Sequence, residues 1–584
     1  MGMSVDLLIL LTYLVIIVAI GFVFSRFNRS GQDFFRSGAK GTWWLVGMSV
    51  FMAGLSANTF TANGGVAYEA GWTVLIIYWG GSLGAIFQVV FFAKRYRRTR
   101  KVTLPEIIHA RFGRAAEQFY SLAKIPSALL ISGIWLWSMG IFTASAFSLD
   151  IHVVIIVVGV VVTTMASAGG SWAVMASDFV QSLIVVSIVI LLSSLVIMDF
   201  GGIHGFVESL GTHSATKDYS FLKEAGEFSG NKFTLFWAMA QVGFTVMMFC
   251  SIEGSVRFLA VKDDSTAVKS ALLVLVLMLL FPLILFVPAW GAAMQLGDQV
   301  AAAPGVNPAE AAYALAAKNW LPPQLLGIMG VAMLAATMSS MDTGINRTSG
   351  IVVRNILPFV LSLLGKEEMK PRTELRAGRI CSIVFGATAI SLAIYYNNRG
   401  SLGVFDTLLN IAALLGVPLA VPMLLGLLIR RAPGWAVFSS YGLGVSVGVF
   451  SLLAPHLGLE PWNFQMRAFG ATIGGTVGFS VAILFWKRTP ENERERILGF
   501  FKMLATPVDF EREVGEGNDA AQAKIIGAFG LALAACMIPL IFISDDLTSF
   551  LSILFVILFV GGVCGLLFAV GVKKSRNESS HKIQ

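Results

Sequence analysis

The chain has 584 residues, of which 56% are hydrophobic and only 13% are charged. Soluble domains carry roughly a quarter charged residues, so this composition excludes an ordinary soluble protein. It also excludes a disordered chain, because 44 Phe and 13 Trp are too many apolar rings to leave in water. The excess of 42 Lys and Arg over 34 Asp and Glu is expected for cytoplasmic loops and indicates no nucleic-acid partner. We therefore predict an all-α polytopic membrane protein.

Apolar stretches long enough to cross a bilayer recur along the whole chain. We predict about 15 spans, at residues 5–25, 43–67, 71–94, 119–148, 151–167, 172–198, 234–259, 270–297, 323–352, 377–397, 404–429, 432–455, 468–486, 524–544 and 549–572. The connections alternate between rich and poor in Lys and Arg, which places the N-terminus outside and the C-terminus in the cytoplasm. The first run is long and has no basic n-region, so we expect no cleavable signal peptide. These features predict a multi-pass protein of the cell (plasma or inner) membrane, embedded in the lipid bilayer.

The chain lacks the motifs of a nucleotide hydrolase or of a polytopic enzyme. It contains no GxxxxGK[ST] loop, no HExxH and no nucleophile motif, so we expect no enzyme activity. A transmembrane gradient must then supply the energy, which favours a secondary transporter over a pump. A channel would need a continuous polar pore, whereas the polar residues of this chain cluster near the midplane. A solute or sodium sensor without transport is an alternative, although no signalling domain is visible.

Two predicted spans are interrupted by small and polar residues. The span at 43–67 is crowded with Gly, Ser, Thr and Asn from Gly47 to Gly65, and the span at 234–259 breaks at Ser251-Ile252-Glu253-Gly254. The two are five spans apart and run in opposite directions, as an inverted repeat with broken helices requires. Close helix packing would explain the small residues of the first span equally well. The carboxylate of Glu253 in the second break favours a binding site.

Ionisable residues inside the membrane are costly and usually functional. Asp178 lies about seven residues into the span at 172–198, and Asp342 lies near the inner end of the span at 323–352. Ser339, Asp342 and Thr343 share one helix face, and such oxygen ligands suit a hard cation such as Na⁺. Each feature has an alternative. The serines at 339 and 340 could bond to the preceding helical turn, Asp178 could pair with a basic residue, and Asp342 could pair with Arg347.

Residues 168–181, which read AGGSWAVMASDFVQ, resemble the GG-x-x-AV-x-x-(T/S)D-x-x-Q signature of the sodium:solute symporter family. That family includes carriers of sugars, proline, sialic acid, pantothenate and monocarboxylates. Further local matches are Thr103-Leu104-Pro105-Glu106, Arg257-Phe258-Leu259-Ala260, and Ser339-Ser340 with Asn346-Arg347-Thr348-Ser349. The resemblance covers roughly residues 5–490.

The resemblance implies a LeuT-type fold, a five-plus-five inverted repeat with one leading helix and additional C-terminal helices. The parts expected are a leading helix and cytoplasmic loop (1–42), repeat one (43–200), an extracellular loop (201–232), repeat two (233–431), two further helices (432–486), a cytoplasmic connector (487–522), and two C-terminal helices with a tail (523–584).

The resemblance also implies where Na⁺ would bind. The first site would use the carbonyls of Met52, Leu55 and Ala336 with the hydroxyls of Ser339 and Ser340. A second cation site, present in some members, would use Asp178, Ser339, Asp342 and Thr343. The family usually has a serine or another small residue at position 342. Asp342 could therefore strengthen a second Na⁺ site or carry a proton instead.

The solute is harder to predict. The positions at which sugar carriers use a carboxamide, a carboxylate and a lysine hold Thr59, Tyr78 and Met278, and the stretch typical of proline carriers is also absent. We expect the solute to contact Ser56, Asn58, Thr59, Tyr78, Ser251 and Glu253. Tyr78 and Trp79 offer an aromatic face, and Glu253 could instead pair with Arg257.

The predicted function is sodium-coupled import of a small polar organic solute by alternating access, carried out by a monomer. The alternative within the same fold is proton-coupled symport, because of the additional carboxylate at Asp342.

Overall fold

The computed structural model describes residues 5–6, 8–9, 11–12 and 39–583, apart from 102, 169–170, 213–218, 304, 306, 323, 366–368, 370, 400–401, 516 and 545. Most of the first predicted span, 5–25, lies outside the described residues. Within the described part, eleven helices are long and apolar enough to cross a membrane, and a twelfth span is a pair of helices bent by 60°. Two shorter apolar helices lie at Ile151–Thr164 and Leu325–Met338. Each predicted span after the first therefore falls on a helix, while the total of 15 stays a prediction.

The helices that fall within predicted repeat one begin with the bent pair. They are α3 (Trp43–Ala53), α4 (Ala57–Phe60), α5 (Ala62–Ala70), α6 (Thr73–Phe87), the π-helix η2 (Gln88–Phe92), α7 (Ala93–Arg98), α8 (Leu104–Phe112), α9 (Arg114–Phe147), α10 (Ile151–Ala168) and α11 (Ser171–Asp199). A short helix, α12 (Gly202–Thr212), follows in the predicted extracellular loop, as does the 3₁₀ turn η3 (Ser229–Asn231).

The second set also begins with a broken helix. It comprises α13 (Leu235–Cys250), α14 (Ile252–Ser255), η4 (Val256–Leu259), α15 (Asp264–Leu285), α16 (Val287–Gln295), α17 (Gly297–Ala301), η5 (Pro308–Ala311), α18 (Ala312–Trp320), α19 (Leu325–Ile351), η6 (Val352–Ile356), α20 (Leu357–Leu363), α21 (Pro371–Arg399), α22 (Val404–Ile411), η7 (Ala412–Gly416) and α23 (Val417–Leu428).

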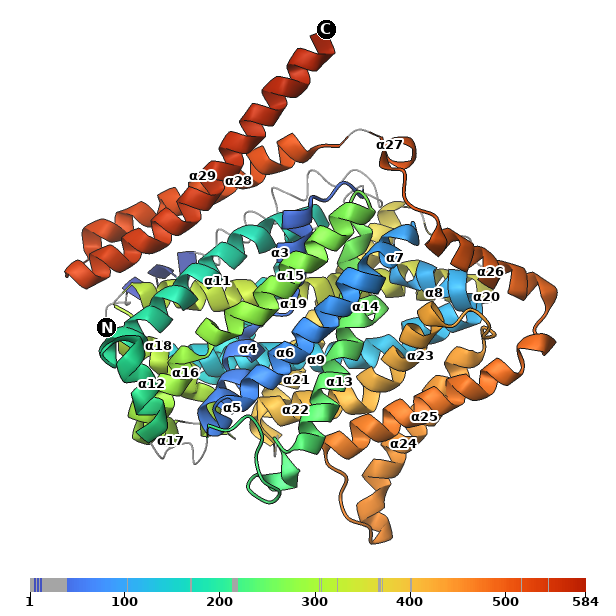
Figure 1. Ribbon diagram of the computed structural model, residues 1–584, viewed down its shortest axis with the longest axis horizontal. Helices are drawn as coiled ribbons and strands as arrows, with labels where there is room; N and C mark the ends of the chain where they lie inside the picture. Colours follow the sequence, from blue (N-terminus) through green and yellow to red (C-terminus); the bar gives the residue numbers. More distant parts are fainter. Residues whose placement is uncertain are drawn as a thin grey trace.

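The C-terminal part forms two helical pairs joined by a polar connector. It comprises α24 (Ala436–Leu453), η8 (Ala454–Leu457), α25 (Phe464–Leu484), η9 (Trp486–Arg488), α26 (Glu491–Ala505), α27 (Phe510–Glu513), α28 (Asp519–Met537), η10 (Ile538–Ile543) and α29 (Leu547–Ile583). Figure 1 shows α24 beside α25 on one side of the bundle and α28 beside α29 on the other. Helix α26 lies against α7 and α8, and its Ile497, Phe500 and Leu504 are buried there.

Each contact between a helix of the first set and a helix of the second has a counterpart in which the two sets swap places. The first helix of each set packs on the second helix of the other, since α3 contacts α15 and α13 contacts α6. The third helices contact each other (α9 with α19), and so do the fourth (α10 with α21). The last helix of each set reaches the third helix of the other, because α11 contacts α19 and α23 contacts α9. Such symmetry is expected of two structural repeats related by a two-fold axis.

Local sequence explains where several of these helices start. Asp263 precedes α15 and its carboxylate accepts a hydrogen bond from the Thr266 backbone N–H at 2.7 Å, and Asn463 does the same for Met466 before α25 at 3.1 Å. Such caps satisfy amide groups that have no partner inside the helix. These groups cannot be left unpaired near a bilayer, because hydrocarbon offers no hydrogen bonds.

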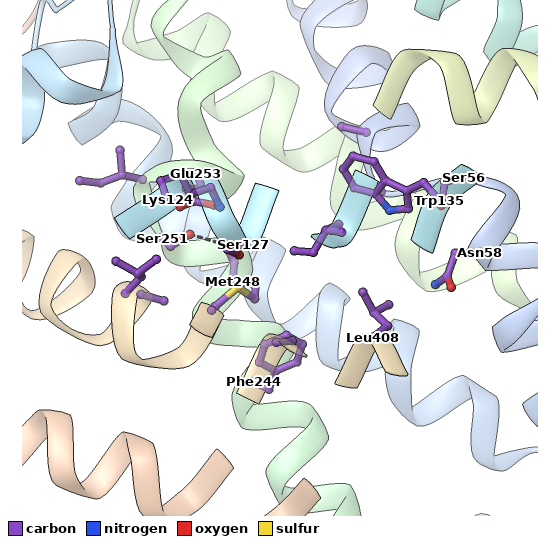
Figure 2. A pocket seen from close by; sticks show the side chains of 18 of the residues that line it. Ser56, Asn58, Lys124, Ser127, Trp135, Phe244, Met248, Ser251, Glu253 and Leu408 are labelled. Atoms are coloured by element: carbon purple, nitrogen blue, oxygen red, sulfur yellow. Dashed lines mark hydrogen bonds and ion pairs between the residues drawn. The ribbon is translucent and has the colours of Figure 1, made fainter. Parts of the chain in front are cut away.

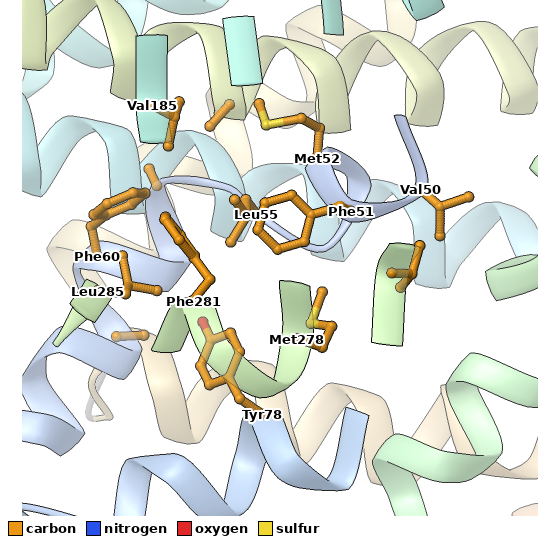
Figure 3. Close-up of a cluster of buried hydrophobic side chains, with 14 of the residues drawn as sticks. Val50, Phe51, Met52, Leu55, Phe60, Tyr78, Val185, Met278, Phe281 and Leu285 are labelled. Atoms are coloured by element: carbon orange, nitrogen blue, oxygen red, sulfur yellow. The ribbon is translucent and has the colours of Figure 1, made fainter. Parts of the chain in front are cut away.

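The break between α3 and α4 is held in a buried apolar cluster. Phe51 packs edge-on against Phe281 of α15, with ring centroids 5.5 Å apart, and Leu55 is 1% exposed (Figure 3). A Cβ on Gly54 would stand 3.1 Å from the terminal methyl of Met278. Gly54 thus lets the bent chain approach α15 closely, and the apolar packing fixes the position of the break.

Candidate functional site

The break in the first helix pair leaves backbone groups in the middle of the bundle. Helix α3 ends at Ala53, and Ser56 is extended with φ −152° and ψ 178° before α4 begins. The Thr59 hydroxyl accepts a hydrogen bond from the Ser56 backbone N–H at 3.3 Å. The Thr337 hydroxyl of α19 accepts one from the Ala57 N–H at 3.0 Å. The amides at the start of α4 are therefore paired, partly by a side chain from the other repeat.

The carbonyl side of the same break is different. The Ser340 hydroxyl lies 3.4 Å from the Leu55 carbonyl oxygen and 3.4 Å from the Ala336 carbonyl oxygen. Both distances exceed the 2.5–3.0 Å of a normal O–H···O bond. Among the described side chains, no closer donor reaches the Leu55 oxygen. The carbonyls of Leu55 and Ala336 and the hydroxyl of Ser340 thus converge on one place between α3 and α19. The side chain of Ser339 lies outside the described residues.

The break between α13 and α14 has no such free oxygens. The Met248 carbonyl accepts from the Ser251 hydroxyl at 2.8 Å, and the Cys250 carbonyl accepts from the Tyr96 hydroxyl at 2.8 Å. The Phe249 carbonyl accepts from the Gln88 amide at 2.6 Å and from the Ser255 hydroxyl at 3.0 Å. The two breaks are equivalent in position, but among the described groups the first leaves carbonyl oxygens available for an ion, and the second has its carbonyls at 248–250 occupied.

A cavity of about 290 Å³ joins the two breaks. Polar side chains gather in two places on its wall, one at each break (Figure 2). The first group is Ser56, Asn58, Thr59 and Asn63, and the second is Tyr120, Lys124, Ser127, Ser251 and Glu253. The wall is otherwise mostly apolar and includes Trp135, Phe244, Met248, Leu408 and Met423. This volume suits a small solute, since pockets for drug-sized ligands measure roughly 300–1,000 Å³.

A partly buried ion pair lies in the second polar group. The Lys124 ammonium of α9 lies 2.5 Å from Glu253 Oε2 of α14, and the Tyr120 hydroxyl donates to Glu253 Oε1. The exposed fractions of the Lys124 and Glu253 side chains are 16% and 27%. The pairing of Glu253 with Arg257 that the sequence allowed is wrong. The partner is Lys124, which lies 129 residues away in the sequence.

Asp178 forms a buried ion pair near the first break. Its Oδ2 lies 2.6 Å from Nη1 of Arg257 and accepts the Ser49 hydroxyl at 2.7 Å. Arg257 also donates to the Ser49 carbonyl at 2.7 Å. Asp178 Oδ1 is buried without a hydrogen-bond partner among the described residues. Of the two interpretations drawn from the sequence, the structure therefore shows the pairing with a basic residue. The side chains of Asp342 and Thr343 lie outside the described residues.

Five of the six expected solute contacts line the cavity, and one does not. Ser56, Asn58, Thr59, Ser251 and Glu253 are on its wall. Tyr78 is not: its hydroxyl accepts from the Asn63 amide at 3.0 Å, behind the wall, and its ring packs edge-on against Phe286. Trp79 donates to the Leu279 carbonyl at 3.3 Å. The expected aromatic face is therefore wrong, and Trp135 and Phe244 are the rings that line the cavity.

Lys124 also lines the cavity, although it is not among the site residues predicted from the sequence. A signal was available, because Lys124 lies inside the predicted span at 119–148 and a lysine in a membrane span is a functional candidate by itself. Asn63 was equally visible in the polar stretch of the first break. No local pattern distinguishes Trp135 or Phe244 from other apolar residues of their helices.

The family model of the sodium:solute symporter family matches residues 34–441. The chain belongs to this family. Among its relatives, the sodium/glucose cotransporter 1 of Ovis aries is 23% identical over 76% of this chain and 71% of its own length. The sodium/sialic acid symporter SiaT of Proteus mirabilis is 24% identical over 80% of this chain and 93% of its own.

A solved structure shares the fold of this family member. A Na⁺-coupled sialic acid symporter, captured in a substrate-bound outward-open state, superposes with a TM-score of 0.69 at 19% identity, covering 84% of this chain and 98% of that one. Membership of the family identifies Na⁺ and a small solute as the co-transported species and confirms the predicted family. The relatives are transporters, which agrees with the expectation that the chain is not an enzyme. Many apolar helices make it a multi-pass membrane protein.

Proposed function

We propose that this symporter imports a small polar organic solute across the plasma or inner membrane by alternating access, and that it functions as a monomer. The alternating charge of its loops supports an N-terminus outside and a C-terminus in the cytoplasm. In that orientation α9 begins at the cytoplasmic side, so the Lys124–Glu253 pair lies on the cytoplasmic side of the first break.

The observation that carries the proposal is the convergence of oxygens at the first break. The Ser340 hydroxyl oxygen lies 3.4 Å from each of the two carbonyl oxygens. If one ion lay about 2.4 Å from both oxygens of such a pair, the oxygen–ion–oxygen angle would be about 90°, which is the angle between neighbouring ligands of an ion. The metal–oxygen distance of about 2.4 Å is that of Ca²⁺, and it applies to Na⁺ because the two ions have nearly the same radius. We assign this site to Met52, Leu55, Ala336, Ser339 and Ser340.

Sodium bound there would connect the two repeats. Leu55 belongs to the broken helix, whereas Ala336 and Ser340 belong to α19, so a shared ion holds the break in one geometry. Ser56, Asn58 and Thr59 follow directly in the chain and line the cavity. The ion thereby orders the solute site, and by linkage the solute strengthens ion binding equally. Each Na⁺ moving down a 100 mV potential adds about 2.3 kcal/mol to the driving force.

A second cation site at Asp178, Ser339, Asp342 and Thr343 stays part of the proposal, with one condition. The Arg257 guanidinium already neutralises the Asp178 carboxylate at 2.6 Å, which weakens its attraction for Na⁺. The free Oδ1 is the oxygen available to a cation, and strong binding would require Arg257 to move away.

The test is uptake into proteoliposomes of labelled sugars, amino acids and carboxylates. An inward Na⁺ gradient should drive accumulation of at least one of them, and an equal K⁺ gradient should not. Ser339→Ala combined with Ser340→Ala should abolish the Na⁺ dependence. A pH gradient at equal Na⁺ on both sides separates the proton-coupled alternative. Accumulation driven by protons in the absence of Na⁺ would overturn the proposal.

A further inference from the structure

Each polar end of the cavity has hydrogen-bonding groups that no described residue uses. At the cytoplasmic end, both oxygens of Glu253 are occupied, Oε1 by the Tyr120 hydroxyl and Oε2 by the Lys124 ammonium. An ammonium has three N–H groups, and only one of those on Lys124 is used. Two N–H groups of Lys124 therefore have no acceptor among the described residues and remain available as donors.

Ser127 adds to these donors. It lies one turn after Lys124 on α9, it is 1% exposed, and it also lines the cavity. No described group forms a hydrogen bond with its hydroxyl, whereas Ser121 and Ser132 on the same helix bond to a carbonyl of the preceding turn at 2.7 and 2.8 Å. Figure 2 shows Lys124, Ser127 and Glu253 close together.

The described charges at this end belong to Lys124, Glu253 and Arg347. Lys124 and Glu253 cancel each other, and Arg347 of α19 acts electrostatically on the same carboxylate. Lys124 lines the cavity, whereas Arg347 is not among the residues of its wall. A partly buried ammonium with unused N–H groups forms its strongest hydrogen bonds with an anion, and a solute carboxylate is such an acceptor.

The opposite end presents an acceptor. The side-chain oxygen Oδ1 of Asn58 is buried and has no hydrogen-bond partner, and Asn58 is 7% exposed. Figure 2 places Asn58 and Ser56 apart from the charged group. A buried carbonyl oxygen without a donor costs about 1–3 kcal/mol, so a ligand that donates to it is favoured. A solute hydroxyl would do so.

Resting on the proposed function, we propose that the solute is a small hydroxycarboxylic acid. Lys124 and Ser127 bind its carboxylate, Asn58 accepts from its hydroxyl, and Phe244, Met248 and Leu408 contact the carbon chain between them. The volume of about 290 Å³ restricts the solute to a small molecule. Glu253 acts as a positioning residue, because it holds the Lys124 ammonium at the cavity wall.

The experiment measures thermal unfolding of the purified full-length protein with Na⁺ and three matched series of probes. These are ω-hydroxycarboxylates of three to six carbons, their amides, and the same acids without the hydroxyl. At saturating Na⁺ at least one hydroxy acid should raise the melting temperature. It should bind about tenfold or more tightly than its amide and than the acid that lacks the hydroxyl, as expected for one lost hydrogen bond to a charged or buried group.

Variants assign each end of the cavity. Lys124→Gln alone would leave Glu253 unpaired and could unfold the protein, so the variant is Lys124→Gln with Glu253→Gln, which removes both charges. It should lose the preference for acid over amide. Asn58→Ala should lose the preference for the hydroxy acid and keep the preference for acid over amide. Lys318→Gln, at a lysine that bonds to Ser148 outside the cavity, should change neither.

Two results would overturn this inference while leaving Na⁺ coupling intact. One is that Na⁺ raises the melting temperature but no hydroxy acid adds to it. The other is that the double variant still prefers acid over amide. If Na⁺ alone does not shift the melting temperature, the assignment of the sodium site fails instead, and this result is read from the samples without solute.

Discussion

Replacing Ser340 by alanine tests the sodium site directly, because two explanations of this serine predict different results. If its hydroxyl only bonds to the preceding turn, the change removes one weak contact. If it is an ion ligand, the change removes one of the five proposed oxygens. The 3.4 Å distances to the Leu55 and Ala336 oxygens favour the second explanation, since a back-bonding serine in the same protein, Ser138, lies 2.9 Å from its acceptor.

The expected size of the effect follows from the charge on the ligand. A hydrogen-bonding group that interacts with a charged partner contributes about 1.5–3 kcal/mol. Since each 1.4 kcal/mol is a factor of ten, Ser340→Ala should raise the apparent Kd for Na⁺ about 10- to 150-fold. The free energy of unfolding without Na⁺ should fall by less than about 1 kcal/mol, because only a weak contact is lost.

The assay is a Na⁺ titration of the melting temperature at constant ionic strength, with K⁺ as the balancing cation. Ser138→Ala is the matched control, because Ser138 is also a fully buried serine inside a long helix. Ser340→Thr keeps the hydroxyl and should retain most of the Na⁺ affinity. If Ser340→Ala and Ser138→Ala titrate alike, the hydroxyl is structural and the assignment of Ser340 as a ligand is wrong.

Three further predictions concern stability and pH. Arg111→Met should lower the free energy of unfolding by about 3 kcal/mol in denaturant titrations. The reason is that the Arg111 guanidinium donates to three carbonyls, those of Gly426, Ile429 and Ala432. Arg114→Met, at an exposed position, is the control and should change this free energy little. Asp178→Asn should lower the free energy of unfolding by about 3–5 kcal/mol, because it removes the carboxylate that pairs with the buried Arg257 guanidinium. Adding Arg257→Gln should recover most of this loss. Equal losses in the single and the double variant would contradict the ion-pair argument. Burial raises the pKa of Glu310, in the loop before α18, from 4.5 to about 8. The folded state therefore holds a proton that the unfolded state releases between about pH 4.5 and 8, so stability from this group falls as the pH rises through that window. Glu310→Gln should flatten the decline in melting temperature over this range, and an unchanged pH profile would refute the assignment.

The family and the two helix breaks could be predicted from the sequence because both depend on local composition. Gly54 with polar neighbours, and Ser251 with Glu253 and Gly254, interrupt runs that are otherwise apolar, and the structure breaks its helices at these places. The polar residues that follow Gly54 then had to face the interior, since hydrocarbon cannot satisfy them. Most of them line the cavity for this reason.

The orientation of Tyr78 could not be predicted in the same way. Helix α6 is apolar all round, with no polar stripe to show which face meets the cavity, and Tyr78 and Trp79 point in different directions from it. An aromatic residue with one hydroxyl is accommodated by any site that offers one hydrogen bond. Asn63, on the neighbouring broken helix, supplies it.

The amino-acid sequence alone was enough to predict that this chain crosses the membrane many times, where its helices break, and which family it joins. The reason is that a bilayer requires long apolar helices, so polar interruptions stand out in the sequence. Which charged residues meet became visible in the folded structure. Glu253 is four residues from Arg257 but pairs with Lys124, and Arg257 pairs with Asp178, 79 residues away. Four residues are one helical turn apart only in a continuous α-helix. Here α14 gives way to a 3₁₀ turn at Val256, so the two side chains separate and each finds its partner on another helix.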